Sequence, residues 1–71
     1  MKLDDWQVRS ERMWMNMHRK YMNQWRKLYR ECPEDLVSER NWRADRYWRE
    51  RRALRQCVKR LTSHYYPHGL R

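Results

Sequence analysis

A tryptophan among regularly spaced arginines is the feature of this sequence that points most directly to ligand chemistry. Within residues 34–62, Trp42 shares the outer side of a predicted helix, opposite its apolar stripe, with basic and amide side chains. An exposed indole can stack on a base or fill a partner's pocket, and arginines bind phosphates or carboxylates. The structural alternative is a solvated face with Trp42 lying over aliphatic stems. The predicted binding residues are Trp42, Arg43, Arg46, Arg49, Arg52, Gln56, Lys59 and Arg60.

The overall charge narrows the class of partner. The 71 residues include 18 Lys and Arg against 9 Asp and Glu, which gives a formal charge of +9 and a pI of about 10.3. Such a charge favours nucleic acid, an acidic protein surface or an anionic membrane. Action on a membrane surface fits less well, because the apolar side of one predicted helix matches that of the other.

Catalysis and metal binding have little support in the sequence. Cys57, His64 and His68 are the closest set of metal-ligating types, but no Cys-x-x-Cys pair exists and Pro67 interrupts the set. The serines have no predicted pocket that would provide a base and an oxyanion site, and glycine-rich phosphate loops are absent. We therefore expect no catalytic residues, no metal, no cofactor and no small-molecule substrate.

Two amphipathic helices are needed to position these side chains. Asp4, with Gln7 three residues later, predicts a helix start, and Pro33 forces Cys32 out of helical conformation, so we expect one helix over 5–31. Its apolar residues recur at helical spacing, and a similar stripe follows in the second half. The predicted core or dimer stripe is Trp14, His18, Tyr21, Trp25, Leu28, Tyr47, Trp48, Leu54, Val58 and Leu61.

A second helix is predicted over 34–62. Pro33 suits the first helical position, and Ser38 is an alternative start. The short connection predicts an antiparallel hairpin in which facing residue numbers total about 70. Trp25 is then expected near Tyr47 or Trp48. Two further arginines of the apolar stripe, Arg40 and Arg51, need either a partner or a route to solvent.

The expected fold is all-α, with residues 1–71 forming a single helical domain and residues 63–71 a partly flexible tail. A two-helix hairpin covers only one side of each apolar stripe. We therefore predict a homodimer that forms a four-helix bundle. The alternatives are that the tail folds back over the uncovered side of the stripes or that another protein covers it.

Two functional hypotheses remain open. The first is a non-enzymatic regulatory or accessory protein that docks its arginines on the phosphates of DNA or RNA. The second is a small inhibitor or adaptor, of the kind found in phages and plasmids, that binds an acidic or grooved face of a larger protein. We expect a cytoplasmic location, because the sequence opens with polar residues and no apolar run approaches the length of a membrane span.

Overall fold

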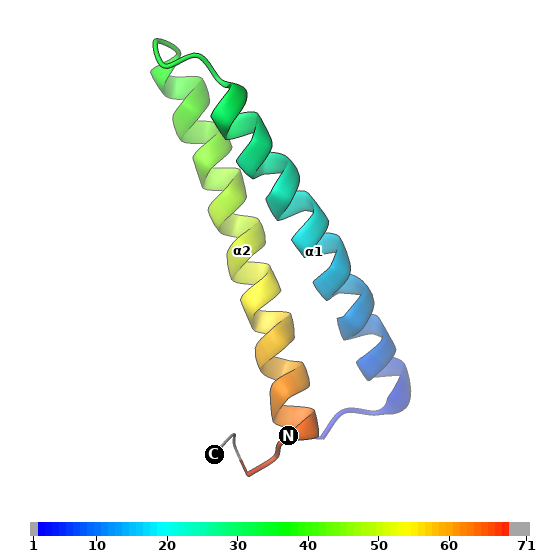
Figure 1. The fold of residues 1–71 in the computed structure, drawn as a ribbon. Helices are drawn as coiled ribbons and strands as arrows, with labels where there is room; N and C mark the ends of the chain where they lie inside the picture. Colours follow the sequence, from blue (N-terminus) through cyan, green and yellow to red (C-terminus); the bar gives the residue numbers. More distant parts are fainter. Residues whose placement is uncertain (1, 69–71) are drawn as a thin grey trace.

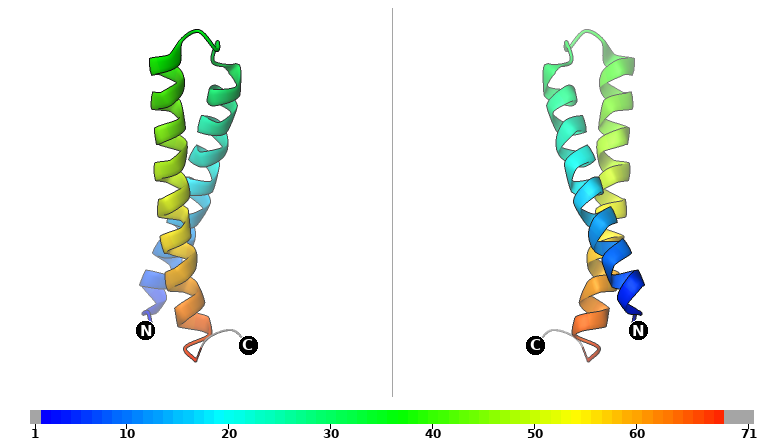
Figure 2. Two further views of the ribbon diagram at one scale, coloured as in Figure 1. Left: turned by 90° about the vertical axis from the view of Figure 1, so that its left-hand side faces the viewer. Right: turned by 90° about the vertical axis from the view of Figure 1, so that its right-hand side faces the viewer.

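The computed structural model describes residues 2–68 and shows an all-helical hairpin (Figure 1). It consists of α1 (Asp5–Glu31) and α2 (Val37–Tyr65). The two helices run antiparallel and stay side by side in the rotated views (Figure 2). The principal extents are 48 × 25 × 14 Å. Since one helix with its side chains is about 10–12 Å wide, the shortest extent corresponds to a single layer of helices with two broad faces.

The bounds of α1 confirm the prediction. Gln7 Oε1 accepts a hydrogen bond from the Asp4 N–H at 2.9 Å, which is one half of the capping box. At the other end, Cys32 has φ −73° and ψ 130° and so leaves the helix in an extended conformation. Pro33 causes this, because its ring disfavours helical geometry in the preceding residue.

The bounds of α2 differ from the prediction at both ends. Pro33 is not the first helical residue: its carbonyl accepts the Leu36 N–H at 3.2 Å in a turn, and α2 begins at Val37, next to the alternative start. The helix also continues beyond Thr62 to Tyr65. The predicted tail is therefore helical in its first residues, and its end, 69–71, lies outside the described residues.

Two arginines of α2 bind the carboxyl end of α1. Arg40 Nη1 donates to the Cys32 carbonyl at 2.9 Å, and Arg43 Nη1 donates to the Leu28 carbonyl at 2.6 Å. The last carbonyls of a helix lack partners within the helix and carry partial negative charge. Arg40 also lies 4.5 Å from the centre of the Tyr29 ring. Arg40 thus finds a carbonyl and an aromatic face as partners.

The middle of the hairpin confirms the predicted register. His18 Nδ1 lies 2.6 Å from Glu50 Oε2, so His18 is hydrogen-bonded between the helices. The aromatic contact of Trp25 was not predicted: its ring packs edge-on against Trp42, with ring centres 5.3 Å apart.

The hairpin has a very small core. Within residues 2–68, the buried apolar side chains are those of Cys32, Cys57 and Leu61. Other members of the predicted stripe are half-buried, namely His18, Trp25, Tyr47 and Leu54. A third group stays exposed in the single chain: Trp14, Tyr21, Leu28, Trp48 and Val58. The stripe is therefore divided between the contact of the two helices and the two uncovered faces.

Candidate functional site

A groove runs between α1 and α2 on one broad face. It consists of two hollows of about 520 and 290 Å³ that share Tyr47. We call it the basic groove, and its lining residues are Met22, Arg26, Tyr29, Ala44, Tyr47, Trp48, Arg51, Leu54, Arg55, Val58 and Lys59.

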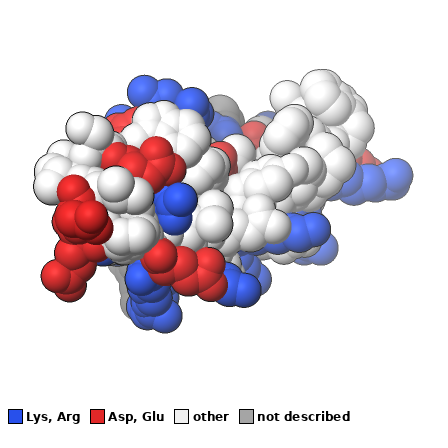
Figure 3. Space-filling view, turned by 90° about the horizontal axis from the view of Figure 1, so that it is seen from above, with Lys and Arg blue, Asp and Glu red and all other residues white. Residues whose placement is uncertain are grey.

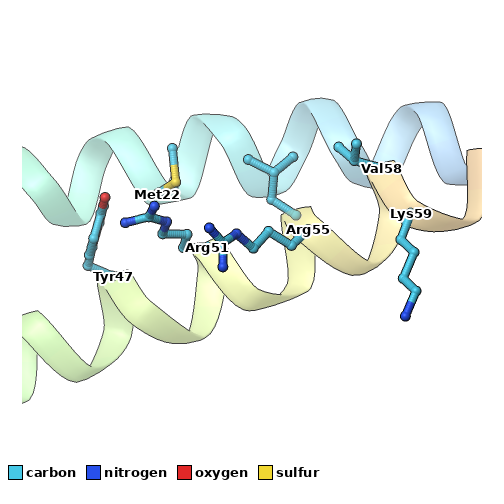
Figure 4. A pocket seen from close by; sticks show the side chains of 7 residues that line it. Met22, Tyr47, Arg51, Arg55, Val58 and Lys59 are labelled. Atoms are coloured by element: carbon cyan, nitrogen blue, oxygen red, sulfur yellow. The ribbon is translucent and has the colours of Figure 1, made fainter. Parts of the chain in front are cut away.

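Helical periodicity gathers these side chains on one face. Tyr47, Arg51 and Arg55 are spaced by four residues along α2, so they lie one above another on the helix surface. Met22 faces them from α1, and Lys59 points away from α1 at the edge of the groove (Figure 4). The groove is thus formed by both helices and exists only in the hairpin.

The groove is positively charged and aromatic. Arg26, Arg51, Arg55 and Lys59 line it, and its described lining includes no carboxylate. Within residues 2–68, none of these four basic groups takes part in an ion pair. The Arg51 guanidinium lies 5.0 Å from the centre of the Trp48 ring, a cation–π contact that orients both side chains.

Four of the basic residues predicted from the sequence fall into two groups. Arg52 and Lys59 line hollows at the rim of the basic groove. Arg43 and Arg49 instead bind acids of their own helix, Glu39 and Asp45, each at 3.0 Å. The chain's own carboxylates therefore already occupy part of the predicted row.

The remaining predicted residues lie away from the basic groove. Trp42 packs against Trp25 across the hairpin, and Arg46 lies 5.2 Å from the centre of the Trp42 ring. Gln56 is exposed. Arg60, which we expected on the outer side of the helix, faces α1 and is half-buried.

The surroundings of Arg60 form a polar cluster close to the termini. Its Nε donates to Glu11 Oε1 at 2.7 Å, and its Nη2 donates to Cys57 Sγ at 3.7 Å. The hydrogen bond from Arg60 lowers the pKa of Glu11 against the opposing effect of burial. Burial, followed by the interaction with Glu11, raises the pKa of the Cys57 thiol. The cluster ties the two helices together, and the raised pKa disfavours the thiolate, which is the reactive form of Cys57.

Sequence reasoning did not assign three of the groove's basic residues to the binding surface. Arg26 lies on the other helix from the predicted row, and Arg55 was assigned to neither side. Arg51 was placed on the apolar stripe. That placement was itself a signal, because an arginine at the edge of an apolar stripe sits where a groove between two helices opens to solvent.

Acidic side chains gather at the turn of the hairpin. Seen along the axis from the turn, carboxylates crowd the near end (Figure 3). Glu31 ends α1, Glu34 and Asp35 lie in the turn, and Glu39 is in the first turn of α2. Two of these acids are paired with basic side chains, Glu31 with Lys27 and Glu39 with Arg43, and among the described residues Glu34 and Asp35 take part in no ion pair.

Other kinds of site find no support in the part of the chain that the structure describes. Among residues 2–68, no three His, Cys, Asp or Glu side chains gather in a way that suits a metal ion. Neither described helix has the length and apolar character to cross a membrane. Cys32 and Cys57 are both free thiols.

Comparison with known proteins gives no match. No protein-family model matches the chain, no curated protein is significantly similar to it, and no solved structure matches its fold.

Proposed function

We propose that this protein binds nucleic acid through the basic groove, as a non-enzymatic regulatory or accessory protein. The observation that supports the proposal is the convergence of Arg26, Arg51, Arg55 and Lys59 on one groove with no carboxylate in its described lining. A phosphate backbone is a continuous row of negative charge, and guanidinium groups bind its oxygens in pairs.

The aromatic side chains of the groove suit a strand with accessible bases. Trp48 lies beside the arginines with 54% of its surface exposed, and the half-buried Tyr47 is next to it. Bases stack on such rings with little dependence on sequence. In duplex nucleic acid the bases are already stacked on each other, so we expect single strands to bind more tightly than duplex at equal charge.

A homodimer is the form in which we expect the protein to act. Since the buried apolar side chains of residues 2–68 are Cys32, Cys57 and Leu61 alone, a single hairpin has little apolar burial to stabilise it. A four-helix bundle would provide the missing burial.

An acidic protein segment is the alternative occupant of the groove. Tryptophan, tyrosine and arginine dominate the energetics of protein interfaces, and the basic groove contains all three types. The experiment below separates this alternative from nucleic acid by means of a polyanion that carries no bases.

The test is the fluorescence anisotropy of labelled single-stranded RNA and duplex DNA, titrated with the whole protein at about 50 and 200 mM salt. Four phosphate contacts give a slope of about −3 in log K against log salt, which corresponds to about a 50- to 150-fold loss of affinity. We expect micromolar or tighter binding at low salt, and a higher affinity for the single strand than for the duplex. Polyglutamate of matched charge is the competitor.

Two results would overturn the proposal. One is the absence of binding to either nucleic acid at low salt, despite the charge of +9. The other is a labelled polyglutamate that binds more tightly than RNA of equal charge, because the groove would then be selective for carboxylates.

A further inference from the structure

A line of exposed apolar side chains runs along the broad face opposite the basic groove. Trp14, Tyr21 and Leu28 recur every seven residues on α1 and keep 44, 38 and 37% of their surface exposed. Trp42 of α2, which is 47% exposed, meets this line through its contact with Trp25. We call these four residues the apolar strip.

Helical geometry separates the apolar strip from the basic groove. Met22 and Tyr29 of the groove each follow a strip residue by one position, which is a rotation of about 100° around the α1 axis. The contact between the helices lies between these two directions. The hairpin therefore presents a basic face and an apolar face on opposite sides of one layer of helices.

We propose that the apolar strip is the surface on which a second copy of this chain docks, so that two hairpins form a four-helix bundle with their basic grooves facing outward. A seven-residue repeat is the spacing that keeps apolar side chains in register along a helix–helix contact. The same line of residues on the second copy can meet it around a two-fold axis.

The exposed area of the chain agrees with a partner of this size. The hairpin exposes 6087 Å², whereas a folded monomer of 9.3 kDa exposes about 5,000 Å². The excess is about 1,000 Å², close to the roughly 800 Å² that each partner buries in a standard interface. A second hairpin is large enough to remove this excess.

The distribution of charge favours the strip over the groove as the face between two copies. Two chains with a charge of +9 repel each other, and the unpaired arginines of the groove would add to that repulsion. At the border of the strip, in contrast, two of the basic groups are paired with acids, and the Arg46 guanidinium lies 5.2 Å from the centre of the Trp42 ring. The pairs there are Glu11 with Arg60 and Glu39 with Arg43.

The arrangement has a consequence for ligand binding, which rests on the proposed function. A dimer joined through the strip presents two basic grooves on opposite sides. One dimer therefore holds two nucleic-acid segments at once, and it binds a long strand with higher avidity than one groove alone.

The primary test is the mass of the protein in solution without nucleic acid, by analytical ultracentrifugation over a range of concentrations. We expect a dimer for the wild type. Tyr21→Ala and Leu28→Ala should each weaken dimerisation about 10-fold or more, because a large apolar contact is lost while alanine preserves the helix. Val58→Ala is the matched control, since Val58 is 43% exposed but lines the groove.

Circular dichroism at high protein concentration distinguishes a variant that has lost the interface from one that has lost the fold. A variant that is fully helical at high concentration, yet dissociates at a higher concentration than the wild type, has lost the interface and not the fold. A monomeric wild type overturns the proposal, and so does a dimer that Val58→Ala weakens more than Leu28→Ala.

A second measurement tests the outward grooves. Donor- and acceptor-labelled single-stranded oligonucleotides, mixed equally, should show energy transfer when the wild-type protein is added in substoichiometric amounts. Leu28→Ala at a concentration where it is monomeric should bind the same oligonucleotides without energy transfer. A wild-type dimer that binds oligonucleotides without energy transfer contradicts the outward grooves. A dimer that binds no oligonucleotide contradicts only the proposed function.

Discussion

The two broad faces of the hairpin are built from the same two helices but have different chemistry. On the face of the basic groove, Arg51 and Arg55 have aromatic and apolar neighbours and no acid. On the face of the apolar strip, Arg43 and Arg60 are both bound by glutamates. Arg55 and Arg60 belong to the same helix. The comparison shows that a charged side chain is available to a ligand only where the fold has not already neutralised it.

The difference between the faces should be largest in nucleic-acid binding. The double variant R51E/R55E removes two phosphate contacts and adds two repulsive charges, so we expect at least about a 100-fold loss of affinity at 50 mM salt. R9E/K20E changes the net charge by the same amount at exposed positions that neither line the groove nor belong to the apolar strip. It should cost less than about 5-fold, because distant charges are screened. Anisotropy titrations of both variants measure the comparison, and equal losses would place the binding site outside the groove.

The same comparison can be made in the free energy of unfolding. Arg60→Met leaves Glu11 half-buried without its partner, and we expect it to cost about 1–2 kcal/mol. Arg55→Met removes an unpaired charge and should change stability by less than about 0.5 kcal/mol. Urea denaturation followed by circular dichroism, at one fixed protein concentration, tests this prediction. A larger cost for Arg55→Met would show that the basic groove has a structural role.

Arg60 also shows where prediction from sequence reached its limit. Trp42 and Arg60 are five helical turns apart, so an ideal helix of 3.6 residues per turn puts them on one line. Both residues contact α1, Trp42 through Trp25 and Arg60 through Glu11. This line therefore lies beside the contact of the two helices and not opposite it. The spacing along the helix was predicted correctly, whereas the side of the helix that faces α1 was not.

Local signals were read more accurately. The bounds of α1 depend on Asp4, Gln7 and Pro33, each of which acts on its immediate neighbours, and they were predicted correctly. The hairpin and its register followed from the short connection between two amphipathic segments. The basic groove could not be predicted in the same way. It needs residues of both helices at a fixed offset, and its free arginines are identified only once the ion pairs of the others are known.

Two tryptophans allow a further comparison of the two broad faces. Trp48 lies at the groove, whereas Trp42 belongs to the apolar strip. Trp48→Ala should reduce affinity for single strands about 5- to 10-fold with little effect on duplex, because a stacking surface is lost. Trp42→Ala should weaken dimerisation and leave the affinity of a short oligonucleotide for one groove unchanged. The reverse pattern would move the binding surface to the opposite face.

The smallest expected difference concerns pH. The hydrogen bond from Arg60 lowers the pKa of Glu11 in the folded chain. A carboxylate of this kind stabilises the fold above its unfolded pKa of about 4.3, and the contribution is lost as pH falls through the lower folded pKa. The urea concentration at the midpoint of wild-type unfolding should therefore decrease once the pH is below about 4.3. Glu11→Gln should be less stable at pH 7 and show a smaller drop on acidification, whereas parallel profiles would show that Glu11 contributes nothing.

The short turn between the helices has a consequence for the order of folding. Contacts across the hairpin join residues that are further apart in sequence with distance from the turn: 8 residues for Arg40 with Cys32, 32 for His18 with Glu50 and 61 for Leu3 with His64. The entropic cost of closing the chain rises by about 2 kcal/mol from the first of these pairs to the last. We therefore expect the helices to zip from the turn toward the termini. Pulse-labelling hydrogen exchange during refolding should then protect amides near the turn earlier than those at the open end.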